Sequence, residues 1–140
     1  VANLERAIRA TAWNTPTMMT RITCDWITDG TVSQLEQAKR RDAAARQQCA
    51  RRVLQGLPWQ GHPNSYFLWL PLPATVRAEQ VVSALLQRNV SVSSAAPFAV
   101  GDHRPQAIRL ALGSLDTARL ESALLLVKEV IDAVECGALD

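Results

Sequence analysis

The chain has 140 residues and a formal net charge of +2. Hydrophobic residues make up 48% of it and charged residues 20%, which is typical of a folded globular domain and not of a disordered segment. No apolar run approaches the roughly 18–20 residues that a membrane helix needs. The small net charge does not by itself indicate an acidic partner. We therefore expect a single cytoplasmic domain over residues 1–140 with no membrane contact.

Cysteines and histidines follow no metal-ligand or disulfide pattern. Cys24, Cys49 and Cys136 are odd in number and widely spaced, and none belongs to a Cys-x-x-Cys pair. We expect buried free thiols in a reducing compartment. His62 and His103 lie in expected loops without a second ligand at helical spacing, so we expect no metal site.

Residues 1–56 predict a helical lead-in. Leu4 and Ile8, four positions apart, indicate a helix over residues 3–11 that ends before Asn14-Thr15-Pro16. A second helix is expected to close at Asp29-Gly30. Its apolar residues recur at helical spacing: Met18, Met19, Ile22, Trp26 and Ile27.

A third helix is expected to open with the capping box Ser33-Gln34-Leu35-Glu36 and to run to about Leu54. The buried stripe that its periodicity predicts is Leu35, Ala38, Ala45, Cys49 and Val53. Lys39-Arg40-Arg41 and Arg51-Arg52 could form a phosphate-binding stripe. Because these cations spread around the helix with Asp42 among them, we favour a solvated helix face.

Residues 65–137 predict a β-α-β-β-α layer. A strand over residues 66–70 is apolar on both faces, so it needs cover on both sides, and a loop precedes it over residues 56–65. Thr75 is expected to cap the next helix, which ends at Asn89. Val90 and Val92 alternate with serines and indicate a second strand.

The last part of the chain predicts a loop over residues 98–103, a third strand over residues 108–112 and a final helix capped by Ser114 or Asp116. The apolar stripe of that helix is Leu120, Leu124, Val127, Ile131 and Val134. The expected fold class is α+β, a small, mainly antiparallel sheet with helices packed on one face.

Arg109 is the strongest candidate for a binding role. Period-two geometry places Ile108 and Leu110 on one face of the third strand and Arg109 on the other. An arginine in the middle of an apolar strand is costly unless its guanidinium meets an anion, and the planar fork suits a carboxylate. A structural salt bridge or a surface arginine on an open face is the alternative interpretation.

Four stretches, in this order and spacing, carry a resemblance to a known family: residues 9–16 (RATAWNTP), 26–30 (WITDG), 62–73 (HPNSYFLWLPLP) and 108–113 (IRLALG). Nearly the whole chain resembles the C-terminal small domain of fold-type I aminotransferases, which depend on pyridoxal 5'-phosphate. It is most similar to the aminotransferase-like half of MocR-type regulators of the GntR family.

The resemblance implies that Arg109 binds the α-carboxylate of an amino-acid ligand. It also implies that Trp13 and Asn14 lie near a dimer interface and a neighbouring subunit's cofactor pocket. A plain helix break with a packed tryptophan is the alternative for these two residues. The family's Pro-Gly loop reads Ala95-Ala96-Pro97-Phe98 in this chain, and the resemblance therefore does not define the shape of the substrate mouth.

Catalysis in this family requires a lysine that forms a Schiff base with the cofactor. The chain contains only Lys39 and Lys128, and neither lies in the strand-and-loop setting that the family uses. We expect no catalytic residue here, no cofactor bound to this chain alone, and no enzymatic activity without further segments.

Our first hypothesis is therefore the C-terminal part of the effector domain of a MocR-type transcription regulator, contributing a carboxylate site and dimer contacts. The expected partners are its own N-terminal and large-domain segments, a second copy, and an amino-acid or vitamer ligand. DNA would bind only through a missing N-terminal domain, and pyridoxal phosphate only in the full-length protein. The alternatives are a fragment of a genuine aminotransferase and a free-standing module that binds a carboxylate or a protein.

Overall fold

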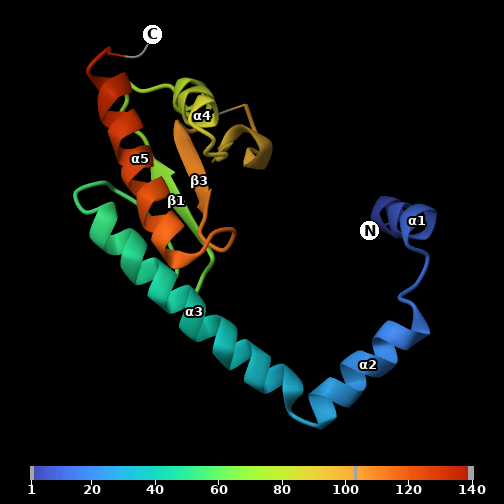
Figure 1. Cartoon of the computed structure of the whole chain (residues 1–140). Coiled ribbons are helices and arrows are strands. Elements are labelled where there is room, and N and C mark those ends of the chain that lie inside the picture. Colours follow the sequence, from blue (N-terminus) through green and yellow to red (C-terminus); the bar gives the residue numbers. More distant parts are fainter. Residues whose placement is uncertain (1, 103, 139–140) are drawn as a thin grey trace. The chain divides into compact units, whose positions relative to one another are not determined.

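The computed structural model describes residues 2–102 and 104–138 of the chain. The elements of these residues follow in the order α1 (Ala2–Thr11), α2 (Thr17–Thr28), α3 (Thr31–Val53), β1 (Phe67–Pro71), α4 (Ala78–Gln87), β2 (Ser93–Ser94), the 3-10 helix η1 (Ala96–Phe98), β3 (Ala107–Ala111) and α5 (Thr117–Glu135) (Figure 1). The chain divides into two compact units, Val1–Lys39 and Arg40–Asp140, and α3 contributes residues to both.

The unit Arg40–Asp140 is built on a three-stranded antiparallel sheet in the order β1-β3-β2. Helices pack on one side of this sheet, and α5 runs alongside β1 and β3 (Figure 1). The expected α+β class is therefore confirmed. We call the side that meets the helices the covered face: Leu68, Leu70, Ile108 and Leu110. We call the other side the open face: Phe67, Trp69, Ser93, Arg109 and Ala111.

The covered face belongs to one hydrophobic core shared by α3, α4 and α5. Of the two predicted caps of α5, Ser114 and Asp116, the structure shows Asp116, whose carboxylate accepts the amide of Arg119 at 2.8 Å. The predicted stripe of α5 is buried throughout: Leu120, Leu124, Val127, Ile131 and Val134. Burial of each such side chain contributes roughly 1.5–3 kcal/mol.

The second strand is shorter than predicted. Val90 and Val92 lie outside β2, so the prediction of a strand through them is wrong. Asn89, the predicted helix end, takes the left-handed conformation with φ 61°, and the amide of Val90 donates to the carbonyl of Leu85. The chain is still completing the helix end at Val90, and it pairs with β3 only from Ser93 onward.

The start of α3 also differs from the prediction. The helix begins at Thr31, so Ser33 lies inside its first turn and not at its cap. The carboxylate of Asp29 accepts the amide of Thr31 at 2.9 Å, so Asp29 pairs an amide at the start of the helix, a role that we expected of Ser33.

Thr75 does not cap α4. Arg77 occupies the N-cap position without a side-chain cap, and the amide of Ala78 donates to the side-chain oxygen of Gln106 at 2.9 Å. This cap comes from a residue 28 positions away, which local sequence patterns do not reveal.

The predicted buried stripe of α3 is only partly right. Cys49 and Val53 are buried, whereas the other members are exposed: Leu35, Ala38 and Ala45. The helix buries three residues that we did not predict: Ala43, Gln47 and Ala50. Gln47 is polar, and its amide donates to the carbonyls of Ser65 and Phe67 at 2.8 and 3.1 Å. Hydrophobic periodicity cannot identify such a position.

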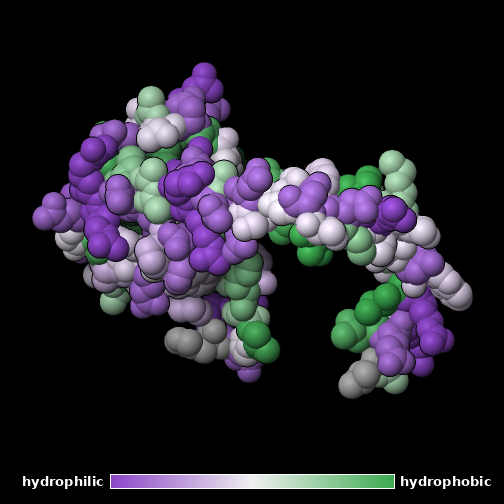
Figure 2. Space-filling model, turned by 90° about the horizontal axis from the view of Figure 1, so that it is seen from below, coloured by the Kyte–Doolittle hydropathy of each residue, from purple (hydrophilic) through white to green (hydrophobic). Residues whose placement is uncertain are grey.

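The unit Val1–Lys39 contains no buried residue among those described. Its helices α1 and α2 match the predicted ones. Hydrophobic side chains lie at its surface (Figure 2): Leu4, Ile8, Trp13, Met18, Met19, Trp26, Ile27, Val32 and Leu35. Large exposed apolar surfaces are rare on monomeric proteins and usually mark interaction sites.

The three cysteines are free, as predicted. Only Cys49 is buried, so the expected burial of Cys24 and Cys136 is wrong. No helix within residues 2–102 and 104–138 is both long and apolar enough to cross a membrane. The same residues contain no cluster of three or more His, Cys, Asp or Glu side chains that could share a metal ion, and the predicted loop residue His103 lies outside them.

Candidate functional site

Arg109 lies in the middle of β3 on the open face of the sheet. Its neighbours along the strand, Ile108 and Leu110, are buried on the covered face, while Arg109 is half-buried. Trp69 of β1 and Ser93 of β2 pair with it across the sheet, so their side chains share its face. The central strand therefore presents a cation between an aromatic ring and a hydroxyl.

Aromatic rings surround the guanidinium. Its Cζ atom lies 3.9 Å from the ring centroid of Phe67 and 5.1 Å from that of Phe98. Trp69 packs edge-on against Phe98, with centroids 6.1 Å apart and ring planes at 80°. A cation within about 6 Å of a ring centroid is attracted by the negative face of the ring. We call these rings the aromatic clamp: Phe67, Trp69 and Phe98.

The side chain of Arg109 forms no hydrogen bond or ion pair with any residue that the structure describes. The structural salt bridge that we considered as an alternative is therefore absent among residues 2–102 and 104–138. A guanidinium carries five N–H donors in one plane, and contact with a ring face uses none of them. A half-buried cation with unused donors is suited to a planar anion such as a carboxylate.

A hydrogen-bonded network connects α3 to the start of β1, the strand that carries two of the three clamp rings, Phe67 and Trp69. The Tyr66 hydroxyl and the Nε of Arg46 both donate to Oδ2 of Asp42 at 2.8 Å. Nη1 of Arg46 also donates to the carbonyls of Leu112, at 2.7 Å, and Leu115. We call Asp42, Arg46 and Tyr66 the Arg46 network. It joins α3 to the chain before β1 and to the chain after β3, and so limits movement of both strands.

The Arg46 network also shifts the protonation of two of its members. The hydrogen bond from Arg46, followed by that from Tyr66, lowers the pKa of Asp42 below 3.8. The hydrogen bond to Asp42, assisted by desolvation, raises the pKa of Tyr66 above 10.0. At neutral pH the network therefore holds a carboxylate and a neutral phenol.

Trp13 and Asn14 belong to the other unit, between α1 and α2. Trp13 is 75% exposed and takes the left-handed conformation with φ 53°, which is uncommon for a bulky residue. The amide of Asn14 donates to the carbonyl of Ala12. Their contribution to a cofactor pocket or dimer interface stays a prediction.

The unit Arg40–Asp140, which contains Arg109, contains one lysine, Lys128, and it does not lie beside Arg109. Lys39 belongs to the unit Val1–Lys39. Lys128 lies on α5, in the helix layer on the far side of the sheet, and its Nζ donates to the carbonyl of Gln55 at 3.4 Å. A Schiff base needs a lysine at the reacting centre. The residues of the unit Arg40–Asp140 that the structure describes therefore do not by themselves fit a complete pyridoxal phosphate site.

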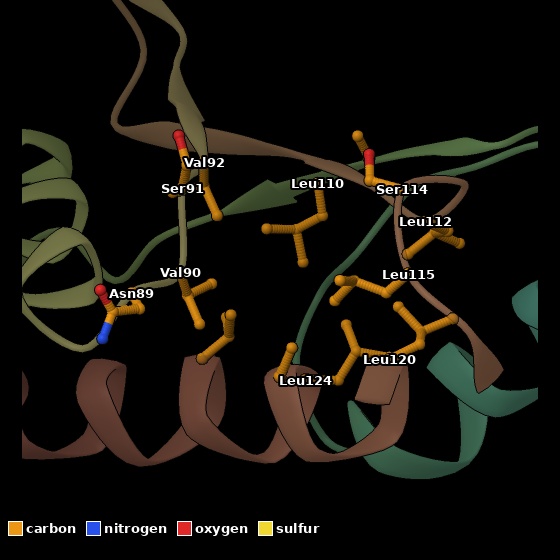
Figure 3. A pocket seen from close by; sticks show the side chains of 13 residues that line it. Asn89, Val90, Ser91, Val92, Leu110, Leu112, Ser114, Leu115, Leu120 and Leu124 are labelled. Carbon is orange, nitrogen blue, oxygen red and sulfur yellow. The ribbon is translucent and has the colours of Figure 1, made fainter. Parts of the chain in front are cut away.

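A second candidate place is an apolar cavity of about 390 Å³ between β3, α5 and the chain after α4. Leucines and valines point into it from three sides, with a few small polar residues at its edge (Figure 3): Asn89, Ser91 and Ser114. None of its lining residues is charged or titratable. The cavity lies on the covered side of the sheet, opposite Arg109, and its lining offers no titratable group that could act as a general acid or base or activate its serine hydroxyls.

No protein-family model and no curated protein matches the sequence. Solved structures do match it. An α-aminoadipate aminotransferase from Thermus thermophilus aligns with 94% of the chain at 18% identity and a TM-score of 0.76. A kynurenine aminotransferase from Pyrococcus horikoshii aligns with 94% of the chain at 15% identity and a TM-score of 0.79. An archaeal alanine:glyoxylate aminotransferase aligns with 91% of the chain at 16% identity and a TM-score of 0.67.

The chain has an aminotransferase-like fold. It spans about a third of the length of these enzymes, with 35%, 34% and 32% of their chains covered. At this level of identity the similarity establishes the fold alone. The fold expected from the four sequence stretches is thereby confirmed, whereas the regulator family is not.

Sequence reasoning found Arg109 but missed the rings that hold it. Phe67 and Trp69 alternate along a strand, and this spacing places them on one face, although it does not reveal which residue they face. Phe98 reaches the site from η1, 11 residues before Arg109, and no pattern in the sequence connects the two.

Proposed function

We propose that this chain forms the C-terminal small domain of a larger aminotransferase-like polypeptide and that Arg109 binds the carboxylate of an amino-acid or vitamer ligand. The observation that carries the proposal is a half-buried mid-strand arginine, held by aromatic rings and without an acidic partner among the described residues. The aminotransferase-like fold of the chain supports the same role.

The part played by this chain is to bind and orient the ligand. Two N–H groups of Arg109 can donate to the two oxygens of one carboxylate, which fixes both the position and the plane of that group. A site on the central strand of a sheet is held more rigidly than a site on a loop. The Arg46 network adds a second anchor, after the end of that strand and before the start of the neighbouring β1.

Pyridoxal phosphate would be held by segments outside the unit Arg40–Asp140, because the one lysine of that unit, Lys128, does not lie beside Arg109. When bound, this cofactor stabilises negative charge that develops at the carbon next to the amino group of a substrate. This chain would position the ligand's carboxylate.

The exposed apolar side chains of Val1–Lys39 support contacts with further segments of the same polypeptide and with a second copy in a homodimer. Trp13 and Asn14 would lie in such a contact. Any binding of DNA would require a separate N-terminal domain.

For the whole protein, we propose a MocR-type regulator whose aminotransferase-like domain senses its ligand; the four sequence stretches that resemble that family support this assignment. A genuine aminotransferase is the second candidate. It is favoured by the three solved structures named above, since each of them is an aminotransferase.

Two experiments test these proposals. In the intact protein, Arg109→Ala should weaken binding of the amino-acid ligand by about 2–4 kcal/mol, as loss of one partner of a charged pair does. Unchanged affinity would contradict the carboxylate-binding role of Arg109.

The reading frame upstream of the Val1 codon distinguishes a regulator from an enzyme. A helix-turn-helix region followed by a cofactor-lysine loop supports the regulator, that loop alone supports the enzyme, and a start codon at Val1 contradicts both.

A further inference from the structure

We infer that Phe67 and Phe98 position the Arg109 guanidinium and select monocarboxylates with an apolar body over dicarboxylates. This inference rests on the proposed carboxylate-binding role of Arg109, and it goes further by naming the class of ligand and the residues that choose it.

The positioning role follows from where the two rings come from. Phe67 is part of β1 and Phe98 ends η1, so two separate elements contact one guanidinium, at 3.9 and 5.1 Å from Cζ. Arginine side chains lose considerable rotamer freedom when they bind a ligand. Rings that already hold the guanidinium reduce that loss while leaving its N–H edge available to a carboxylate.

The preference for an apolar body follows from the ring surface that stays uncovered. Phe67 is 45% exposed and Phe98 47% exposed, and half-buried Trp69 continues the same surface through its contact with Phe98. A ligand anchored by its carboxylate at Arg109 would place its next atoms over these rings. Burial of apolar ligand surface there is favourable in proportion to its area.

Discrimination against a second carboxylate follows from the charge of the sheet. Arg109 is the only charged residue in β1, β2 and β3. The residue opposite it on β2 is the uncharged Ser93. A second carboxylate laid over the clamp would lose water without gaining a cation from the sheet, which is costly.

The test uses the intact polypeptide that contains this chain, with phenylacetate and succinate as probes observed by NMR at the Arg109 side chain. Phenylacetate should bind about 5- to 10-fold more tightly than succinate, as expected from the burial of one aromatic ring. Phe67→Leu and Phe98→Leu should each weaken phenylacetate binding by about 2- to 5-fold, the strength of a cation–π contact. Phe67→Tyr and Phe98→Tyr should restore it.

A second measurement, made without ligand, tests whether the rings position the Arg109 guanidinium. In the free chain the rings should shift the Arg109 side-chain proton resonances upfield, and Phe67→Leu should return them toward the values of a solvated arginine. Leu125→Ala, at an exposed apolar position of α5, is the matched control and should change neither resonances nor affinities.

The outcomes separate the inference from the proposed function. If both probes bind at Arg109 equally well and the leucine variants change nothing, the selective role of the rings is wrong and the carboxylate site stands. If neither probe perturbs Arg109 while the ring shifts are present, the proposed function fails and the ligand class fails with it.

Discussion

The covered face and the open face of the same sheet give neighbouring residues of one strand different surroundings. On the covered face, Ile108 and Leu110 are buried in a core shared by three helices. On the open face, Arg109 lies between them in sequence, contacts aromatic rings, and has no acidic partner in the described part of the chain. The alternation of a strand thus gives adjacent residues different surroundings, an apolar core on one face and an aromatic-lined surface on the other.

The largest expected effect tests that separation directly. Ile108→Ala should lower the free energy of unfolding by about 2–5 kcal/mol, because it leaves a cavity among fully buried neighbours. Arg109→Ala, one position away on the open face, should lower it by less than about 1 kcal/mol, since ring contacts of a half-exposed cation are weak. Urea unfolding followed by circular dichroism measures both, and equal losses would contradict the division of roles.

The next effect concerns the Arg46 network. The Arg46 side chain is only 13% exposed and donates to two backbone carbonyls and to Asp42. Arg46→Met keeps its length but leaves these acceptors unpaired, so we expect a loss of about 1.5–3 kcal/mol in thermal or urea unfolding. Arg21→Met removes an exposed pair with Asp25 and should cost no more than about 0.5 kcal/mol. A similar cost at both positions would mean that the network does not anchor the sheet.

A smaller effect depends on pH. The pKa of Asp42 is lowered on folding, so its contribution to stability is present above pH 3.8 and lost as pH falls through the lower folded value. The pKa of Tyr66 is raised, so its contribution is present below pH 10.0 and lost as pH rises through the higher folded value. Asp42→Asn should flatten both limbs of the stability profile. Tyr66→Phe should abolish the alkaline limb and also weaken the acid limb, because the Tyr66 hydroxyl helps to lower the pKa of Asp42. Unaltered profiles would contradict these shifts.

The smallest effect on stability is expected in the unit Val1–Lys39. Trp26→Ser and Leu4→Ser change exposed side chains, so unfolding of the unit Arg40–Asp140 should stay within about 0.5 kcal/mol of the wild-type value. Self-association measured by sedimentation velocity should decrease, because these residues carry the exposed apolar surface. Association that is unaffected by both substitutions would argue against a contact role for this unit.

Much of the fold could be predicted because its signals are local. The stripe of α5, its Asp116 cap, and the left-handed turn at Asn89 all depend on spacings within a few residues. The opposed faces of Arg109 and Ile108 depend on the period of a strand. The structure confirms the predictions of these features.

The errors arose where distant residues decide the local structure. Gln106 caps α4 from 28 positions away, which left Thr75 without that role. Gln47 is buried because its amide bonds to the carbonyls before and within β1, although its side chain is polar. Phe98 joins the site through η1 for the same reason. Such contacts form only in the folded chain and leave no periodic signal.

The most direct test of a carboxylate site on the open face is an acetate titration of the 140-residue chain, followed at the arginine Nε–H resonances. We expect a saturable change at Arg109 and none at Arg119, which is exposed and already paired with Asp116. A carboxylate held by two N–H donors should also slow solvent exchange of the Arg109 protons. Equal, unsaturable shifts at Arg109 and Arg119 would contradict a built site and leave Arg109 an ordinary surface cation.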